Sequence, residues 1–183
     1  PYIPDEPEHP MPDLPSDVAQ GGAVMYVREN AAGLRPGNRP GPRDLGRPQR
    51  LFASPGEREA GVIAVTPLKD IKGTVALSAS DLQGANGAEL SASAFDIRYV
   101  RYGEYPVMGG YEVRPHFLVP WVPNRMEEGI TRGFWLDLQT PEDAQPGFYD
   151  GTLTLTGPGP AATLPVEDRI LPLKLPMCRL YAG

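Results

Sequence analysis

The 183-residue sequence contains one cysteine, two histidines and no long apolar run. A single cysteine, Cys178, excludes a disulfide within the chain. His9 and His116 are far apart in the sequence and Cys178 is far from both, so we expect no metal site and no cofactor. Apolar runs fall far short of the roughly 20 residues that cross a bilayer, so we expect no membrane span.

Positive charge is also scarce, since 17 Lys and Arg residues face 23 Asp and Glu residues and the formal net charge is -6. Nucleic-acid binding needs a basic surface, so we expect no nucleic-acid partner. A Gly-x-Ser-x-Gly motif is missing, and adjacent carboxylates such as Glu127 and Glu128 point to opposite faces of a strand, which makes them a poor acid-base pair. We therefore expect no catalytic residue and no enzyme activity.

Proline and glycine are abundant, at 23 and 21 residues, and eleven of the prolines fall before residue 56. This pattern predicts an extended Pro/Gly-rich arm over residues 1–50, because proline blocks helices and favours a polyproline-like chain. The segment near 23–28 is the only strand candidate in the arm. The arm is acidic first and basic second, and its candidate assembly residues are Asp5, Glu6, Glu8, Val24, Tyr26, Val27, Arg35, Arg39, Arg43 and Arg47.

From Leu51 onward, short β-branched or alternating runs are separated by turn residues, which predicts an all-β domain over residues 51–177 and a tail over 178–183. Alternation is clear around Phe95–Tyr99 and Phe134–Leu138, so one face of each strand should be buried. The number and spacing of strands predict a two-sheet sandwich. The expected strands are 51–53, 61–66, 74–80, 95–101, 112–119, 131–139, 151–156 and 170–175.

The segment from Pro141 to Thr156 reads as a turn of acidic residues and Pro-Gly followed by a strand that Tyr149 enters. A tyrosine in this position can return its hydroxyl to the backbone as a tyrosine corner, and Gly151 permits close approach of a neighbour. The pattern Pro-x-x-Ala-x-Pro-Gly-x-Tyr-x-Gly-x-Leu resembles the corner of immunoglobulin-like domains that precede the catalytic barrel in extracellular enzymes like glycoside hydrolase family 123. The resemblance covers roughly residues 51–175.

This resemblance implies an immunoglobulin-like β-sandwich of bacterial origin and an extracellular or cell-surface location. In that family the catalytic acidic pair lies in the barrel that follows the domain, so no catalytic residue carries over to this chain. Aromatic side chains crowd the stretch around Gly109 and could form a glycan platform or a contact with another subunit. The candidates are Tyr102, Tyr105, Trp121 and Trp135.

Three functions from different classes follow from these patterns. The first is a structural subunit that self-associates with copies of itself, including into filaments, by adding the 24–27 strand of its arm to a neighbouring sheet edge as a donor strand. The second is a carbohydrate-associated accessory module of an extracellular glycoside hydrolase, with polysaccharide as its partner. The third, a small free-standing enzyme, has little in the sequence to favour it.

Overall fold

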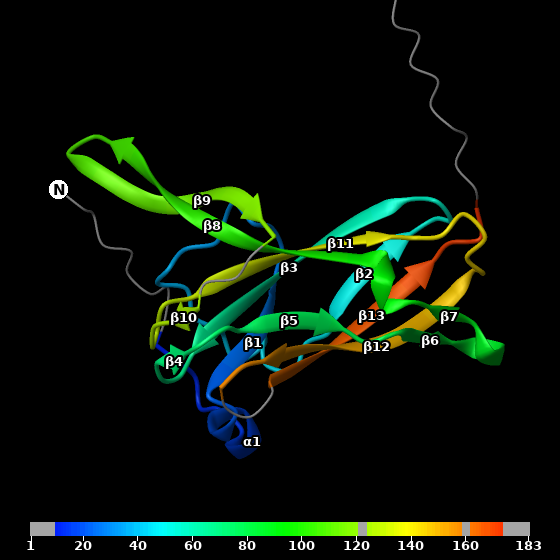
Figure 1. Cartoon of the computed structure of the whole chain (residues 1–183), viewed down its shortest axis with the longest axis horizontal. Coiled ribbons are helices and arrows are strands. Elements are labelled where there is room, and N and C mark those ends of the chain that lie inside the picture. Colours follow the sequence, from blue (N-terminus) through cyan, green and yellow to red (C-terminus); the bar gives the residue numbers. More distant parts are fainter. Residues whose placement is uncertain (1–9, 121–123, 159–161, 174–183) are drawn as a thin grey trace, which may run out of the picture.

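The computed structural model describes residues 10–120, 124–158 and 162–173, and it is an all-β sandwich of two main sheets (Figure 1). The fold class expected from the alternating runs is confirmed. One sheet has the order β1 (Ala23–Arg28), β3 (Arg58–Pro67), β11 (Arg132–Gln139), β8 (Phe95–Val107) and β9 (Gly110–Val119). The other has the order β2 (Gln49–Ala53), β13 (Ala162–Ile170), β12 (Gly147–Thr156), β6 (Leu82–Gly84) and β7 (Glu89–Leu90), with β5 (Ala76–Ala79) also paired to β12.

The remaining elements are short. β4 (Ile71–Lys72) and β10 (Arg125–Met126) form a separate two-stranded sheet, and the helical elements are α1 (Ser16–Gln20), η1 (Ala85–Gly87) and η2 (Ala92–Ala94). Within the described part of the chain, no helix has the length and apolar character needed to cross a membrane.

The main core lies between the two large sheets and follows the two-residue period of the strands. In β11, Phe134, Leu136 and Leu138 are fully buried and face the second sheet. From the opposite side, Leu153 of β12 and Leu164 of β13 point into the same core. The alternation in the sequence thus selects the buried face of each strand.

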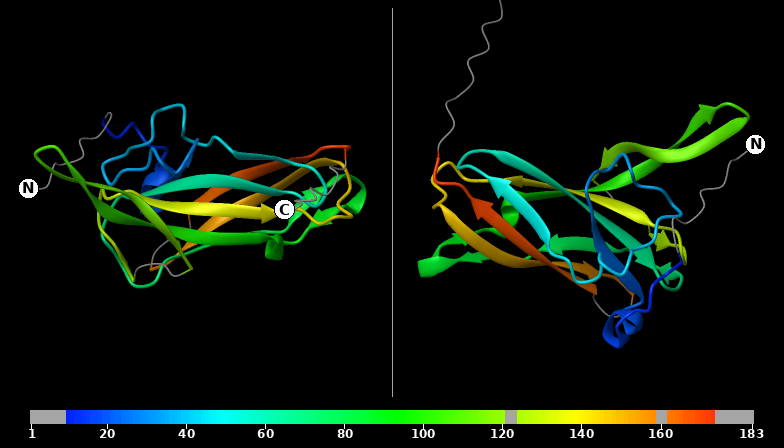
Figure 2. Two further views of the ribbon diagram at one scale, coloured as in Figure 1. Left: turned by 90° about the horizontal axis from the view of Figure 1, so that it is seen from above. Right: turned by 180° about the vertical axis from the view of Figure 1, so that it is seen from behind.

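The arm adds a strand and a second small core on the outer face of the five-stranded sheet. β1 pairs antiparallel with β3 of the same chain, from Ala23 opposite Pro67 to Arg28 opposite Val62. The chain then crosses the outside of this sheet before it enters β2 (Figure 2). Leu34 is fully buried there, in a cluster with Tyr26, Val62, Ala64 and Val100.

Several strands differ from the expected ranges. The final expected strand, 170–175, is wrong, because β13 spans Ala162–Ile170 and residues 171–173 lie outside any strand. β8 and β9 extend beyond their expected limits to Val107 and Gly110, where they form one long hairpin that projects from the sandwich (Figure 1). The expected 74–80 strand shrinks to β5, and the brief strands β4, β6, β7 and β10 were not expected at all.

Candidate binding surfaces

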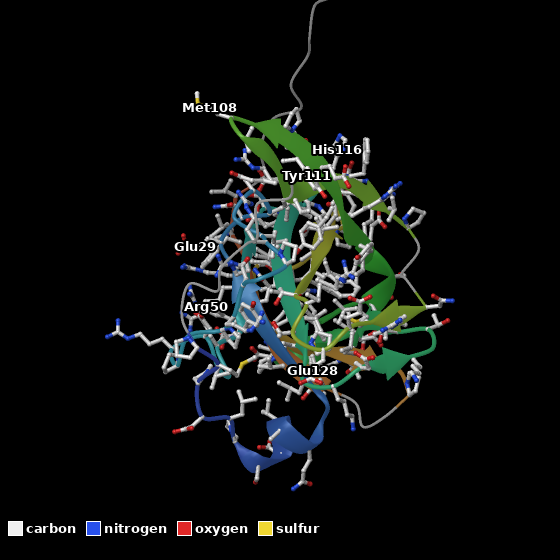
Figure 3. The ribbon with its side chains drawn as sticks, turned by 90° about the vertical axis from the view of Figure 1, so that its left-hand side faces the viewer. Glu29, Arg50, Met108, Tyr111, His116 and Glu128 are labelled. Carbon is white, nitrogen blue, oxygen red and sulfur yellow. The ribbon has the colours of Figure 1, made fainter. Side chains whose placement is uncertain are left out.

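The projecting β8–β9 hairpin carries exposed apolar side chains along its length. Met108 is fully exposed at its tip, where Gly109 takes a φ of +90° to close the turn. His116 and Tyr111 lie on the same hairpin below Met108 (Figure 3). Phe117 and Leu118 are exposed as well. The hairpin is therefore accessible to a partner.

A β-bulge sets the order of the aromatic rings on the hairpin. Arg101 pairs with Phe117 but Tyr102 pairs with Pro115, so His116 is an extra residue in β9. Its ring lies over Gly103, where any β-carbon would collide with it. His116 stacks on Phe117 with 3.8 Å between centroids and meets the Tyr105 ring edge-on at 5.3 Å. The bulge thus builds a row of three rings.

The four aromatic residues singled out in the sequence do not form one platform. Tyr105 joins the ring row, but Tyr102 packs against the Leu34 cluster and donates a hydrogen bond from its hydroxyl to the Thr131 carbonyl at 3.1 Å. Trp135 is half-buried on the outer face beside Ala31 of the arm, where it lines a hollow of about 280 Å³. Trp121 lies outside the described residues.

The outer face of the six-stranded sheet carries an aromatic row that sequence reasoning missed. Cross-strand pairing places Phe52 of β2, Arg169 of β13 and Phe148 of β12 side by side. Phe52 is 53% exposed and Phe148 is 68% exposed. The Arg169 guanidinium lies over the Phe148 ring, 5.3 Å from its centroid. These side chains line a hollow of about 270 Å³ that also includes Arg50 and Glu167.

Five of the arm residues proposed for assembly make contacts within their own chain. Val24, Tyr26 and Val27 belong to β1 and pair with β3. Arg35 donates to the Ala32 and Leu34 carbonyls, and Arg39 donates to the carbonyls of residues 37 and 38. Arg43 and Arg47 are exposed on the following loop, while Asp5, Glu6 and Glu8 lie outside the described residues.

Tyr149 has the geometry of a tyrosine corner. Its hydroxyl donates to the Gln145 carbonyl at 2.8 Å, four residues upstream in the turn that precedes β12. Its ring packs on Gly84 of β6, where an added β-carbon would lie 2.7 Å from Cε1. Gly151 accommodates the Leu82 side chain in the same way. These contacts fix the position at which the chain enters β12.

A buried carboxylate lies next to this corner. Asp168, directly opposite Tyr149 in the β12–β13 pair, is 1% exposed, and within the described part of the chain neither of its carboxylate oxygens accepts a hydrogen bond of good geometry. Burial raises the pKa of Asp168 to about 6, the nearby backbone N–H of Arg169 lowers it in part, and the charge of Glu59 raises it further. Burial, followed by the charge of Glu57, also raises the pKa of Glu59.

These carboxylates do not form a metal centre of the usual composition. Among residues 10–120, 124–158 and 162–173, no group of three His, Cys, Asp or Glu side chains is arranged to hold a metal ion. The hairpin row and the aromatic row on the six-stranded sheet are two surfaces with exposed aromatic side chains that a partner can reach.

Comparison with known proteins identifies the fold. No family model matches the sequence, and no curated protein matches it either. Among solved structures, a family 123 glycoside hydrolase from Clostridium perfringens superposes with a TM-score of 0.71 at 18% identity. The match covers 84% of this chain and 28% of the hydrolase, so this chain spans little more than a quarter of that protein's length. The resemblance expected from the residues around Tyr149 is confirmed at the level of fold.

Two further solved structures match with lower TM-scores. The PapD-like domain 7 of human CEP192 matches with a TM-score of 0.39 at 9% identity, over 93% of this chain and all of that one. The enzyme AvmM of alchivemycin A biosynthesis matches with a TM-score of 0.47 at 9% identity, over 86% of this chain and 93% of that one.

Proposed function

We propose that this chain is a non-catalytic accessory β-sandwich of an extracellular glycan-degrading system, in which it contacts carbohydrate. The observation that carries the proposal is the superposition of 84% of the chain on 28% of a family 123 glycoside hydrolase. A shared fold alone does not transfer an activity, so the role assigned here is that of a module rather than of the hydrolase. Two exposed aromatic rows supply surfaces on which sugar rings could stack.

Self-assembly through the arm is the competing function, and the contacts of the arm weigh against it. A donor strand has to leave its own chain, whereas β1 pairs with β3 of the same chain over six residues. Leu34 is also buried against its own sheet. Donation of this segment would expose both cores, so we place the accessory role first.

Two measurements on the intact chain test these functions. Light scattering over a hundredfold concentration range should give particles with the 19.8 kDa mass of one chain. Growth into larger particles or fibres would instead support assembly. In sedimentation with insoluble polysaccharides, the chain should be retained by at least one of them without releasing reducing sugar. Retention by none of a broad panel would contradict the accessory role, and release of sugar would identify an enzyme.

A further inference from the structure

The two outer faces of the sandwich differ because the arm covers only one of them. Residues 29–48 cross the outside of the five-stranded sheet, and Leu34 and Ala31 pack there. No segment of the described residues crosses the outside of the six-stranded sheet in this way, and its strands β2, β12 and β13 alternate between buried and accessible positions. The broad open face of the molecule therefore belongs to the six-stranded sheet.

We propose that this open face binds a carboxylate-bearing pyranose through Phe52, Arg169 and Phe148. The inference rests on the proposed accessory function and deepens it by naming the binding site and the class of sugar. Pairing in β12–β13 and β13–β2 holds the three side chains in one row across three strands. Phe148 and Phe52 are more than half exposed although they are large and apolar.

Charge in the row favours an acidic ligand. Arg50 is occupied by Glu167, with 2.9 Å between Nε and Oε2. Arg169 makes no ion pair with any carboxylate in the described part of the chain, and its guanidinium lies over the face of the Phe148 ring. A guanidinium presents five donors in a planar fork that fits a carboxylate with two parallel hydrogen bonds. On a chain of net charge -6, this is a specific site for an anion.

The rings on either side complete the site. An aromatic face accommodates the C–H groups of a pyranose, while the guanidinium between the rings binds the acidic group of the sugar. The hollow of about 270 Å³ between these side chains is open along the sheet, so successive units of an acidic chain could continue past it. A neutral sugar would leave Arg169 without a counter-charge.

The test is calorimetric titration of the intact chain with oligogalacturonate, oligomannuronate and hyaluronan fragments, each beside a neutral oligosaccharide of similar length. We expect at least one acidic ligand to bind at least tenfold more tightly than its neutral counterpart, and binding to weaken as salt is raised. Arg169→Gln should reduce that affinity at least tenfold. Phe148→Leu keeps the apolar volume but removes the ring, and it should reduce affinity as well. Arg43→Gln, at an exposed arginine outside both aromatic rows, is the matched control and should bind normally. Phe117→Ala tests the hairpin row as the alternative site.

Each other outcome overturns the inference in a distinct way. Binding that is lost in Phe117→Ala but kept in Arg169→Gln would place the site on the hairpin, with the accessory function intact. Equal binding of neutral and acidic ligands would overturn the choice of an acidic sugar. Binding of no soluble acidic sugar, with polysaccharide retention preserved, would assign the row to another occupant, such as a protein domain. Loss of all carbohydrate binding would remove the proposed function too.

Discussion

Leu34 of the arm lies directly on Gly133 of β11, in the space that a side chain at position 133 would occupy. The contact explains how an arm rich in proline and glycine keeps one path across the sheet. Nearby, Thr131 donates its backbone N–H to the Pro36 carbonyl at 2.8 Å and its hydroxyl to the Asn38 carbonyl at 2.6 Å. The missing side chain at Gly133 thus leaves the space that the Leu34 side chain fills.

Leu34→Ala should destabilise the whole domain, by about 2–4 kcal/mol, because it removes a fully buried leucine and leaves a cavity on Gly133. Urea unfolding measures the loss. Trp135 packs against the same cluster, so its emission should shift to the red in the variant. Leu118→Ala, at an exposed leucine of the hairpin, should change stability little. Equal effects of the two substitutions would show that the arm contributes no packing.

The stability of the domain should rise as the solution is acidified from about pH 7 toward pH 4.5. Asp168 has a folded pKa of about 6 against an ordinary value of 3.8, so its contribution to stability is fully present below 3.8 and is lost as the pH rises through 6. Glu59, whose pKa is also raised, acts in the same direction. A shift of about two pKa units corresponds to at most about 3 kcal/mol.

Asp168→Asn should flatten this dependence and stabilise the protein at pH 7.5, because a neutral amide replaces a buried charge. Urea unfolding at pH 4.5 and 7.5 compares the two proteins. Asp150→Asn, at an exposed carboxylate of β12, is the matched control and should retain the wild-type profile. An unchanged profile in Asp168→Asn would mean that the buried carboxylate does not control the pH response.

The tyrosine corner should depend on both the hydroxyl and the ring of Tyr149. Tyr149→Phe removes the hydrogen bond to Gln145 and should cost about 1 kcal/mol. Gly84→Ala places a β-carbon against the ring and should cost more, about 1–3 kcal/mol, because the ring has to move. Combining the two should give less than the sum of their effects, since both act on one contact. Thermal unfolding of the four proteins forms the cycle.

A chain that begins at Leu51 should fail to fold as a stable monomer. It lacks β1 and Leu34, so Val62, Ala64 and Val100 would lie exposed along the uncovered strand β3 and its neighbours. Circular dichroism and light scattering should show aggregation. Removal of residues 1–9 alone should leave the fold intact. This second deletion separates the effect of losing the acidic segment from the effect of losing the packed part of the arm. A folded monomer from Leu51 onward would contradict the structural role of the arm.

Local patterns predict the strands whose alternation is regular. Phe95–Tyr99 and Phe134–Leu138 alternate between apolar and mostly polar side chains, and both lie in strands at those positions. β13 escaped prediction because Pro165 and the run Glu167–Arg169 read as a loop, and because its inward position 168 holds a carboxylate rather than an apolar residue. The alternation rule fails where a polar group is buried.

The candidate binding surfaces depend on which residues of neighbouring strands lie opposite one another, and local sequence patterns do not predict that register. Phe52, Phe148 and Arg169 are distant in the chain and become neighbours only when β2 pairs parallel with β13 and β12 pairs antiparallel with it. A single exposed phenylalanine in a strand is unremarkable. The ring row of the hairpin likewise requires the bulge at His116, for which no local signal exists. Tyr149 was accessible to prediction because its partner Gln145 lies in the same turn.

The parallel pairing of β2 with β13 determines how this part of the domain responds to a pulling force. The chain enters β2 at Gln49, opposite Val166, and leaves β13 at Ile170, opposite Ala53. Tension applied between the residue just before β2 and the residues just after β13 therefore pulls these two strands in opposite directions along their length. Their hydrogen bonds are loaded together in shear rather than opened one at a time. The β2–β13 pair therefore resists stretching between these two points of the chain.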